Sequence, residues 1–255
     1  MLLMFKMRPF YILAIIALLV SCTSDTEPLP VNLADYVELN SDLVLSELIA
    51  CAGGNAEGIF EGDELPTSVI YLPIEGATEV RYYESNGLLD SLDFSAYTAR
   101  EIDSEPIING KLRKFNIEPF EGEKMSLVSY ITEGRLHICN PIRLKTNTKP
   151  TEVNNNLVNI QELGVNPRFD WEVGQIDENA IYFQVIADEN GNFISGTYTF
   201  EQNFTFYDLD NVVLNITDPE SNPTLEPDTD YTFTLMGVSL DNWVNLLIKR
   251  DFSTN

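Results

Sequence analysis

The feature that most limits how this chain can fold is a series of short β-branched and aromatic runs, separated by clusters of Gly, Pro, Asn and Asp. In Tyr231-Thr-Phe-Thr-Leu235 the large apolar side chains alternate with threonines. A period of two places apolar side chains on one face of a strand and polar ones on the other. The sequence therefore predicts an all-β protein made of antiparallel sheets. The other clear runs are 68–72, 79–83, 125–131 and 181–186, and only 42–50 has a short helix as an alternative.

Landmarks in the two halves of the chain repeat at a nearly constant spacing. Glu84-Ser-Asn-Gly87 resembles Asp188-Glu-Asn-Gly191 at an offset of 104 residues (188 − 84), and Ile117-Glu-Pro119 resembles Leu225-Glu-Pro227 at an offset of 108 (225 − 117). Asn-Gly is a strong hairpin signal because the tight turn needs positive φ angles. The repeat predicts two tandem β-sandwich modules, residues 41–146 and 152–255, joined by a polar linker, 147–151.

The second module carries a family signature. Leu225-Glu-Pro-Asp-Thr-Asp-Tyr231 matches the Leu-x-Pro-x-Thr-x-Tyr pattern of fibronectin type III domains, and Phe169-Asp-Trp171 resembles the core tryptophan segment of that family. The resemblance implies an immunoglobulin-like sandwich with a tyrosine corner, in which the Tyr231 hydroxyl bonds back to the chain a few residues upstream. The first module lacks the tyrosine after Pro119 and contains no tryptophan. Only the repeat identifies it as a second sandwich.

The N-terminus has the pattern of an export signal. Lys6 and Arg8 precede an apolar run that ends at Val20, which is too short for a membrane-spanning helix. We therefore expect residues 1–21 to be a signal peptide. Leu19-Val-Ser-Cys22 resembles the lipobox of bacterial lipoproteins, which implies cleavage before Cys22 and acylation of its sulfur. Residues 22–40 would then be a lipidated flexible tether.

This resemblance also implies a location. Two or more acyl chains hold a protein stably on a membrane without any spanning helix. Thr23 follows the cysteine, where lipoproteins kept in the inner membrane typically carry Asp, so we expect the outer membrane. Asp25 and Glu27 resemble the surface-export signal of Bacteroidetes lipoproteins. Exposure of the protein on the cell surface or on the periplasmic face stays open.

Charge and cysteine content limit the partners and the cross-links. The formal net charge of −25 repels phosphate backbones, so we expect no nucleic-acid partner. With Cys22 acylated, Cys51 and Cys139 remain. An exported protein folds in an oxidising compartment, which favours a disulfide between them. The alternative is a pair of free buried thiols on strands that do not meet.

The sequence contains no catalytic or metal-binding signature. His137 is the only histidine, so a multi-histidine zinc site is excluded and a hydrolase would need this one imidazole as its base. We predict a non-enzyme without metal or cofactor. A carboxylate-dependent glycoside hydrolase is the remaining catalytic alternative, because it needs only two suitably placed acids.

Loops on a rigid sandwich are where recognition is expected. In the fibronectin-like module two loops at one end, 174–179 and 239–243, would present an indole beside carboxylates and an amide, a combination that suits a sugar ring. Alternatively, the tryptophan begins the last strand and packs inward. We therefore expect a non-catalytic binding or spacer lipoprotein that captures a polysaccharide, or else an adhesin or envelope-assembly protein that binds protein through a strand edge. The candidate ligand-binding residues are Asp177, Glu178, Asp241, Asn242 and Trp243.

Overall fold

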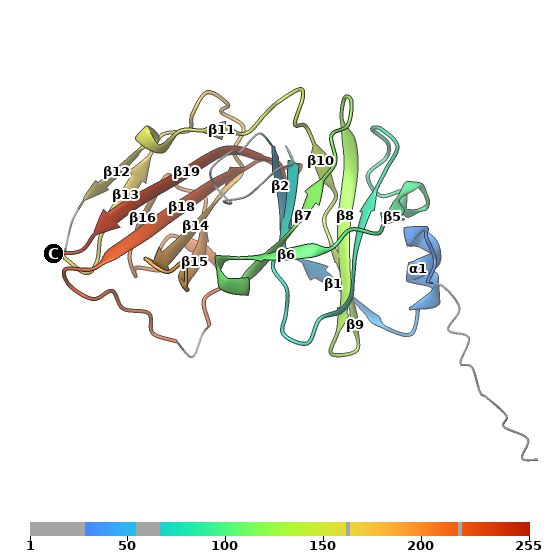
Figure 1. The fold of residues 1–255 in the computed structure, drawn as a ribbon, viewed down its shortest axis with the longest axis horizontal. Helices are drawn as coiled ribbons and strands as arrows, with labels where there is room; N and C mark the ends of the chain where they lie inside the picture. Colours follow the sequence, from blue (N-terminus) through green and yellow to red (C-terminus); the bar gives the residue numbers. More distant parts are fainter. Residues whose placement is uncertain (1–28, 55–66, 162–163, 219–220) are drawn as a thin grey trace, which may run out of the picture.

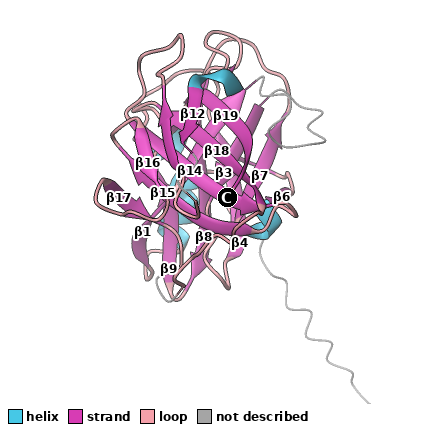
Figure 2. Cartoon of the chain, turned by 90° about the vertical axis from the view of Figure 1, so that its left-hand side faces the viewer, coloured by secondary structure: helices cyan, strands magenta, loops and turns pink. Residues whose placement is uncertain are grey.

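The computed structural model describes residues 29–54, 67–161, 164–218 and 221–255. Within these residues the chain forms four β-sheets that follow one another along the long axis of the molecule (Figure 1). Figure 2 looks along that axis, with the sheet that contains β12 and β16 toward the viewer. The all-β fold predicted from the sequence is confirmed. The expected signal peptide, 1–21, and Cys22 lie outside the described residues.

The first sandwich is built from the N-terminal half of the chain. One of its sheets has the order β1-β9-β8-β4-β5, with β10 also paired to β8, and the other has the order β2-β3-β7-β6. The strands are β1 (Val44–Leu48), β2 (Ala50–Gly54), β3 (Thr67–Tyr71), β4 (Thr78–Glu84), β5 (Thr98–Arg100), β6 (Ser104–Ile107), β7 (Leu112–Ile117), β8 (Lys124–Thr132), β9 (Arg135–Cys139) and β10 (Ile142–Leu144), with 3-10 turns η1 (Phe94–Ala96) and η2 (Ile108–Gly110).

A short helix, α1 (Leu33–Leu39), packs on the outer face of the first sheet. Asn32 caps its N-terminus by accepting hydrogen bonds from the first-turn backbone amides. Leu33 and Tyr36 are fully buried, and the guanidinium of Arg81 lies 4.5 Å from the centre of the Tyr36 ring. The expectation of a flexible tether up to residue 40 was therefore wrong for its last part. The helical alternative for 42–50 was also wrong, because β1 and β2 occupy that stretch.

The second sandwich has the predicted fibronectin type III-like arrangement. One sheet has the order β12-β13-β16, and the other has the order β11-β19-β18-β14-β15-β17. The strands are β11 (Glu152–Val153), β12 (Val158–Gln161), β13 (Arg168–Trp171), β14 (Ile181–Asp188), β15 (Phe193–Thr199), β16 (Asn203–Thr205), β17 (Val212–Asn215), β18 (Asp230–Val238) and β19 (Val244–Ser253), with 3-10 turn η3 (Asn155–Leu157).

The signature residues of the second sandwich adopt the expected roles. The hydroxyl oxygen of Tyr231 accepts a hydrogen bond from the backbone amide of Glu226 at 2.8 Å, which is the tyrosine corner. Trp171 is buried in the core between the two sheets, edge-on to the ring of Tyr182. Tyr231, Phe233 and Leu235 point into this same core, as the alternation in β18 predicted.

The two sandwiches have matching strand pairings and turns at the positions where their sequences resemble each other. In each, an early strand pairs in parallel with the last long strand: β1 with β9, and β11 with β19. The two similar turns also occupy equivalent places, because 84–87 follows β4 and 188–191 follows β14. In the second turn the Asp188 carboxylate accepts hydrogen bonds from the backbone amides of Asn190 and Asn192. This is the hairpin role that the sequence indicated.

Hydrophobic side chains of the described residues gather in three cores, and one of these lies between the sandwiches. Ile70 of β3 points away from its own sandwich and meets Phe183 of β14 and Met236 of β18. Strands β3 and β14 thus bury both faces, since their alternate residues Val69 and Ile186 lie in the cores of their own sandwiches. The sandwiches are therefore stacked face to face, with a continuous apolar layer between them.

The expected disulfide between Cys51 and Cys139 is not present, because both cysteines are free thiols. Cys51 packs against the core between the sandwiches, whereas Cys139 lies in the core of the first sandwich. In β2 the side chain next to Cys51, Ala52, points to the opposite face. The two sulfurs therefore lie on opposite sides of one sheet. Burial raises the pKa of each thiol to about 12.

Candidate functional site at the junction of the two sandwiches

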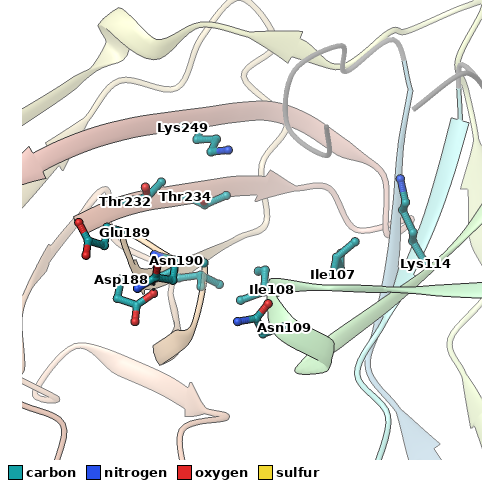
Figure 3. A pocket seen from close by; sticks show the side chains of 13 residues that line it. Ile107, Ile108, Asn109, Lys114, Asp188, Glu189, Asn190, Thr232, Thr234 and Lys249 are labelled. Carbon is teal, nitrogen blue, oxygen red and sulfur yellow. Dashed lines mark hydrogen bonds between the residues drawn. The ribbon is translucent and has the colours of Figure 1, made fainter. Parts of the chain in front are cut away.

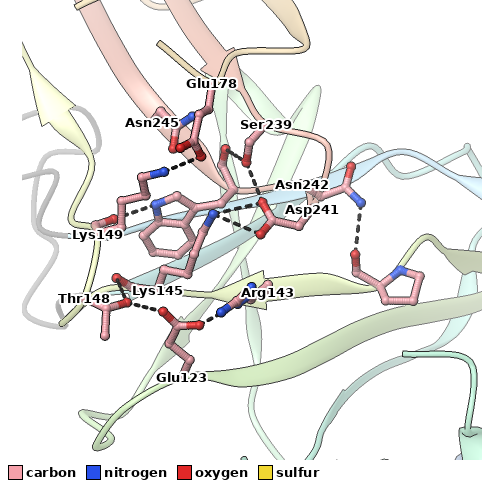
Figure 4. Close-up of polar contacts among 12 residues, drawn as sticks. Glu123, Arg143, Lys145, Thr148, Lys149, Glu178, Ser239, Asp241, Asn242 and Asn245 are labelled. Carbon is pink, nitrogen blue, oxygen red and sulfur yellow. Dashed lines mark hydrogen bonds and ion pairs between the residues drawn. The ribbon is translucent and has the colours of Figure 1, made fainter. Parts of the chain in front are cut away.

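Trp243, a candidate for stacking on a sugar ring, is fully buried, with an exposed fraction of 0%. It follows the tight turn between β18 and β19, and it belongs to the hydrophobic core of the first sandwich. Its Nε1 donates a hydrogen bond to the backbone carbonyl of Lys149 at 2.8 Å (Figure 4). Of the two alternatives, the stacking platform was wrong. Inward packing describes the residue better, although its side chain enters the core of the first sandwich and not that of its own.

The backbone of β2 approaches this indole closely. The amide of Ala52 donates a hydrogen bond to the Asn242 carbonyl at 3.0 Å, and Ala52 forms a parallel bridge with Trp243. A Cβ atom on Gly54 would lie 2.8 Å from Cη2 of the indole and 2.5 Å from Oγ1 of Thr146. A glycine at position 54 is thus required for the two sandwiches to come this close.

Asp241 fastens the same turn to the first sandwich. Its carboxylate accepts hydrogen bonds from Nζ of Lys145 at 2.9 and 3.0 Å and from the Ser239 hydroxyl at 2.6 Å. Burial alone would raise the pKa of this carboxyl, but the Ser239 hydroxyl and the Lys145 ammonium outweigh it and lower the pKa below its ordinary value. Asp241 is therefore a charged anchor of the turn.

Of the remaining candidate ligand-binding residues, two make contacts within the protein and one is exposed to solvent. The side-chain amide of Asn242 donates to the Pro141 carbonyl at 3.0 Å, and the residue has a φ of 60°. Glu178 forms an ion pair with Lys149 (Figure 4). Asp177 is exposed on the same loop. The structure therefore brings Glu178, Asp241, Asn242 and Trp243 together, but as bonds between the sandwiches, and sequence periodicity gave no signal for this role.

The predicted linker, 147–151, is a packed part of this junction. The Thr151 side chain is buried, donates to the Val244 carbonyl at 2.7 Å and accepts from the Gly54 amide at 2.9 Å. Together with the Lys149 contacts, these bonds tie the connecting segment to both sandwiches. The junction holds the sandwiches in one arrangement.

A cavity of about 400 Å³ opens beside the apolar layer between the sandwiches (Figure 3). One wall comes from the corner of β6 and η2, with Ile107 and Ile108. The other is the face of the second sandwich that carries Val185, Thr234 and Lys249. These three residues are direct neighbours across β14, β18 and β19. The threonine face of β18, which the sequence predicted to be polar, thus lines an open cavity.

The described residues contain no group of three or more His, Cys, Asp or Glu side chains that could hold a metal ion. His137 is buried, stacks on the Tyr130 ring with centres 4.9 Å apart, and its Nδ1 lies 3.1 Å from the Glu47 carbonyl oxygen. It is a structural side chain. Among the described residues no helix is long and apolar enough to cross a bilayer.

Comparison with known proteins finds similarity at the level of solved structures only. No family model and no curated protein matches the chain. The FN1–FN3 domains of chicken CNTN1 are 11% identical, with 84% of this chain and 68% of that chain covered and a TM-score of 0.29. A two-domain fibronectin type III segment of chicken tenascin is 13% identical, with 84% and 98% covered and a TM-score of 0.25. The chicken interferon gamma receptor alpha chain is 11% identical, with 74% and 91% covered and a TM-score of 0.22.

Proposed function

We propose that this chain is a membrane-anchored, non-catalytic protein whose two sandwiches form one rigid body that binds an envelope protein. The observation that carries the proposal is the apolar core between the sandwiches, closed by Trp243. A body of this kind holds its outer surfaces at a fixed distance and orientation from its anchor. The loop acids Glu178 and Asp241 are held in ion pairs with lysines, which supports a structural role for them over a catalytic one.

The anchor would be Cys22, and the tether would be short. Pro30 is eight residues after that cysteine (30 − 22), and eight extended residues span at most about 29 Å. From there the chain is held: the Arg81 guanidinium donates to the Pro30 carbonyl at 2.7 Å, and the Ala99 amide donates to the Val31 carbonyl at 2.8 Å. The first sandwich would therefore stand next to the bilayer, with the second beyond it.

A strand edge on the second sandwich favours a protein partner over a glycan. Strand β17 ends its sheet, and Val213 and Leu214 on it are 48% and 41% exposed. The segment Val212–Asn215 contains neither lysine nor proline, the residues that commonly protect such edges. An extended segment of a partner can add to an edge of this kind through main-chain hydrogen bonds. A glycan site at the loops 174–179 and 239–243 has lost the exposed indole on which it depended.

Two experiments test the proposal. Cys22→Ala should release the full chain from membranes, whereas Cys51→Ala, which removes a half-buried thiol, should leave it bound. Continued retention of Cys22→Ala would refute the anchor. A photo-crosslinking residue at Leu214 should capture a discrete envelope protein, and the same residue at exposed Asn159 on β12 should not. Equal capture at both positions, or turnover of a polysaccharide by the purified protein, would refute the binding role.

A further inference from the structure

The cavity between the sandwiches has one apolar and one polar wall. Ile107 and Val185 are buried at its base, where the core between the sandwiches ends. Thr234 pairs with Lys249 across β18 and β19, so their side chains lie on the same face. Both line the cavity together with Ile107 and Ile108 (Figure 3). Its volume of about 400 Å³ falls within the range of small-ligand pockets, roughly 300–1,000 Å³.

Lys249 lies in the polar wall of the cavity. It is half-buried, and its side chain makes no hydrogen bond or ion pair within the part of the chain that the structure describes. The half-buried Lys124 and the buried Lys145 have carboxylate partners, Glu84 at 2.5 Å and Asp241 at 2.9 Å. A cation withdrawn from water is stabilised by an anion, and the formal charge of −25 shows that anions are abundant.

The acidic side chains near Lys249 have other hydrogen-bond partners or point into solvent. Asp188 accepts hydrogen bonds within its own turn, from the amides of Asn190 and Asn192. Asp251 accepts a hydrogen bond from the Thr232 hydroxyl at 2.8 Å. Glu189 is exposed and points away from the isoleucine wall (Figure 3). The Lys249 ammonium is therefore available to an anion that enters the cavity.

We propose that this cavity binds an acidic sugar residue. Its carboxylate would pair with the Lys249 ammonium, its hydroxyls would exchange hydrogen bonds with Thr234 and the exposed Asn190 amide, and one aliphatic ring face would lie on Ile107 and Ile108. The site is independent of the membrane anchor and of the β17 edge. The ligand is a uronate, either free or as a residue of an acidic polysaccharide.

The test measures binding to the full chain. The ligands are free glucuronate and an oligosaccharide that contains glucuronate, and glucose is the uncharged control. Calorimetry or ligand-detected NMR should show binding of at least one uronate and at least tenfold weaker binding of glucose. Lys249→Gln should weaken uronate binding at least tenfold. Arg250→Gln, an exposed position next to it on β19, should leave binding unchanged. Thr234→Val gives a second variant that should weaken binding without changing a charge.

Three results would overturn the proposal: no binding of either uronate source, equal binding of glucose and glucuronate, or unchanged uronate affinity in both folded cavity variants. Preference for the monosaccharide over the oligosaccharide would identify the free sugar as the ligand, and the reverse would identify the polymer.

Discussion

The indole Nε1 of Trp243 lies 2.8 Å from the backbone carbonyl oxygen of Lys149, so a side chain that follows the last turn of the second sandwich is bonded to the segment that leaves the first. The indole ring fills part of the core of the first sandwich at the same time. One residue thus contributes both packing and a hydrogen bond to the junction. Replacing it should affect the whole molecule.

Comparison of the two tryptophans separates these contributions. Trp243→Phe removes volume and also leaves the Lys149 carbonyl without its donor, whereas Trp171→Phe removes similar volume from a buried indole whose Nε1 has no hydrogen-bond partner among the described residues. Urea unfolding should show a cost about 1 kcal/mol or more greater for Trp243→Phe. Trp243→Ala should cost about 3–5 kcal/mol. Equal costs for the two Phe variants would mean that the hydrogen bond contributes nothing.

The Asp241 carboxylate makes stability depend on pH. Its pKa is lower in the folded protein than its ordinary value, so the ion pair with Lys145 contributes stability above that ordinary value and loses it as the pH falls through the lowered folded pKa. Asp241→Asn should be less stable than the wild type at neutral pH, and the difference should shrink in acid. Asp177→Asn, an exposed acid in the neighbouring loop, should follow the wild-type profile. An unchanged difference across the acid range would contradict this role.

The tyrosine corner predicts a modest and specific loss. Tyr231→Phe removes the acceptor of the Glu226 amide at a part-buried site and should destabilise the protein by about 1 kcal/mol in chemical denaturation. Tyr207→Phe is the matched control, because its hydroxyl accepts a hydrogen bond from Asn215 at an exposed site. It should stay within about 0.5 kcal/mol of the wild type. A larger loss in the control would rule out a special role for the corner.

The half-buried Cys51 and the buried Cys139 should both behave as unreactive thiols. Because burial raises the pKa of Cys51 and Cys139 to about 12, little thiolate is present at neutral pH. A thiol reagent should therefore modify both only after denaturation, with the same count before and after treatment with a reductant. A count that rises only after reduction would demonstrate the disulfide that this structure lacks.

Features set by local sequence could be predicted. The runs at 68–72 and 181–186 coincide with β3 and β14 because β-branched and aromatic residues favour strands. In 231–235, a period of two also specified the face that is buried in the core of the second sandwich. The Leu-x-Pro-x-Thr-x-Tyr motif predicted the corner because its bond spans only a few residues. The cap at Asn32, followed by Asp35 in the first turn, was a signal that could have identified helix α1.

Features set by tertiary contact could not be predicted in this way. Alternation shows that Cys51 and Ala52 point to opposite faces of β2, but it does not show that a second sandwich covers the outer one. The same limit applies to Trp243, which was placed in an accessible loop because its partner, Lys149, lies 94 residues earlier in the chain. The alternation of residues in a sequence identifies the two faces of a strand, and only the tertiary structure shows what packs against each face.

The central claim is that the two sandwiches form one rigid body, and a distance between the outer sheets tests it most directly. Spin labels at Thr98→Cys on β5 and Asn159→Cys on β12, both exposed, can be measured by pulsed electron paramagnetic resonance in the full chain. We expect a single narrow distance distribution that broadens in Trp243→Ala. A broad distribution in the otherwise unaltered protein would contradict the rigid junction and the function inferred from it.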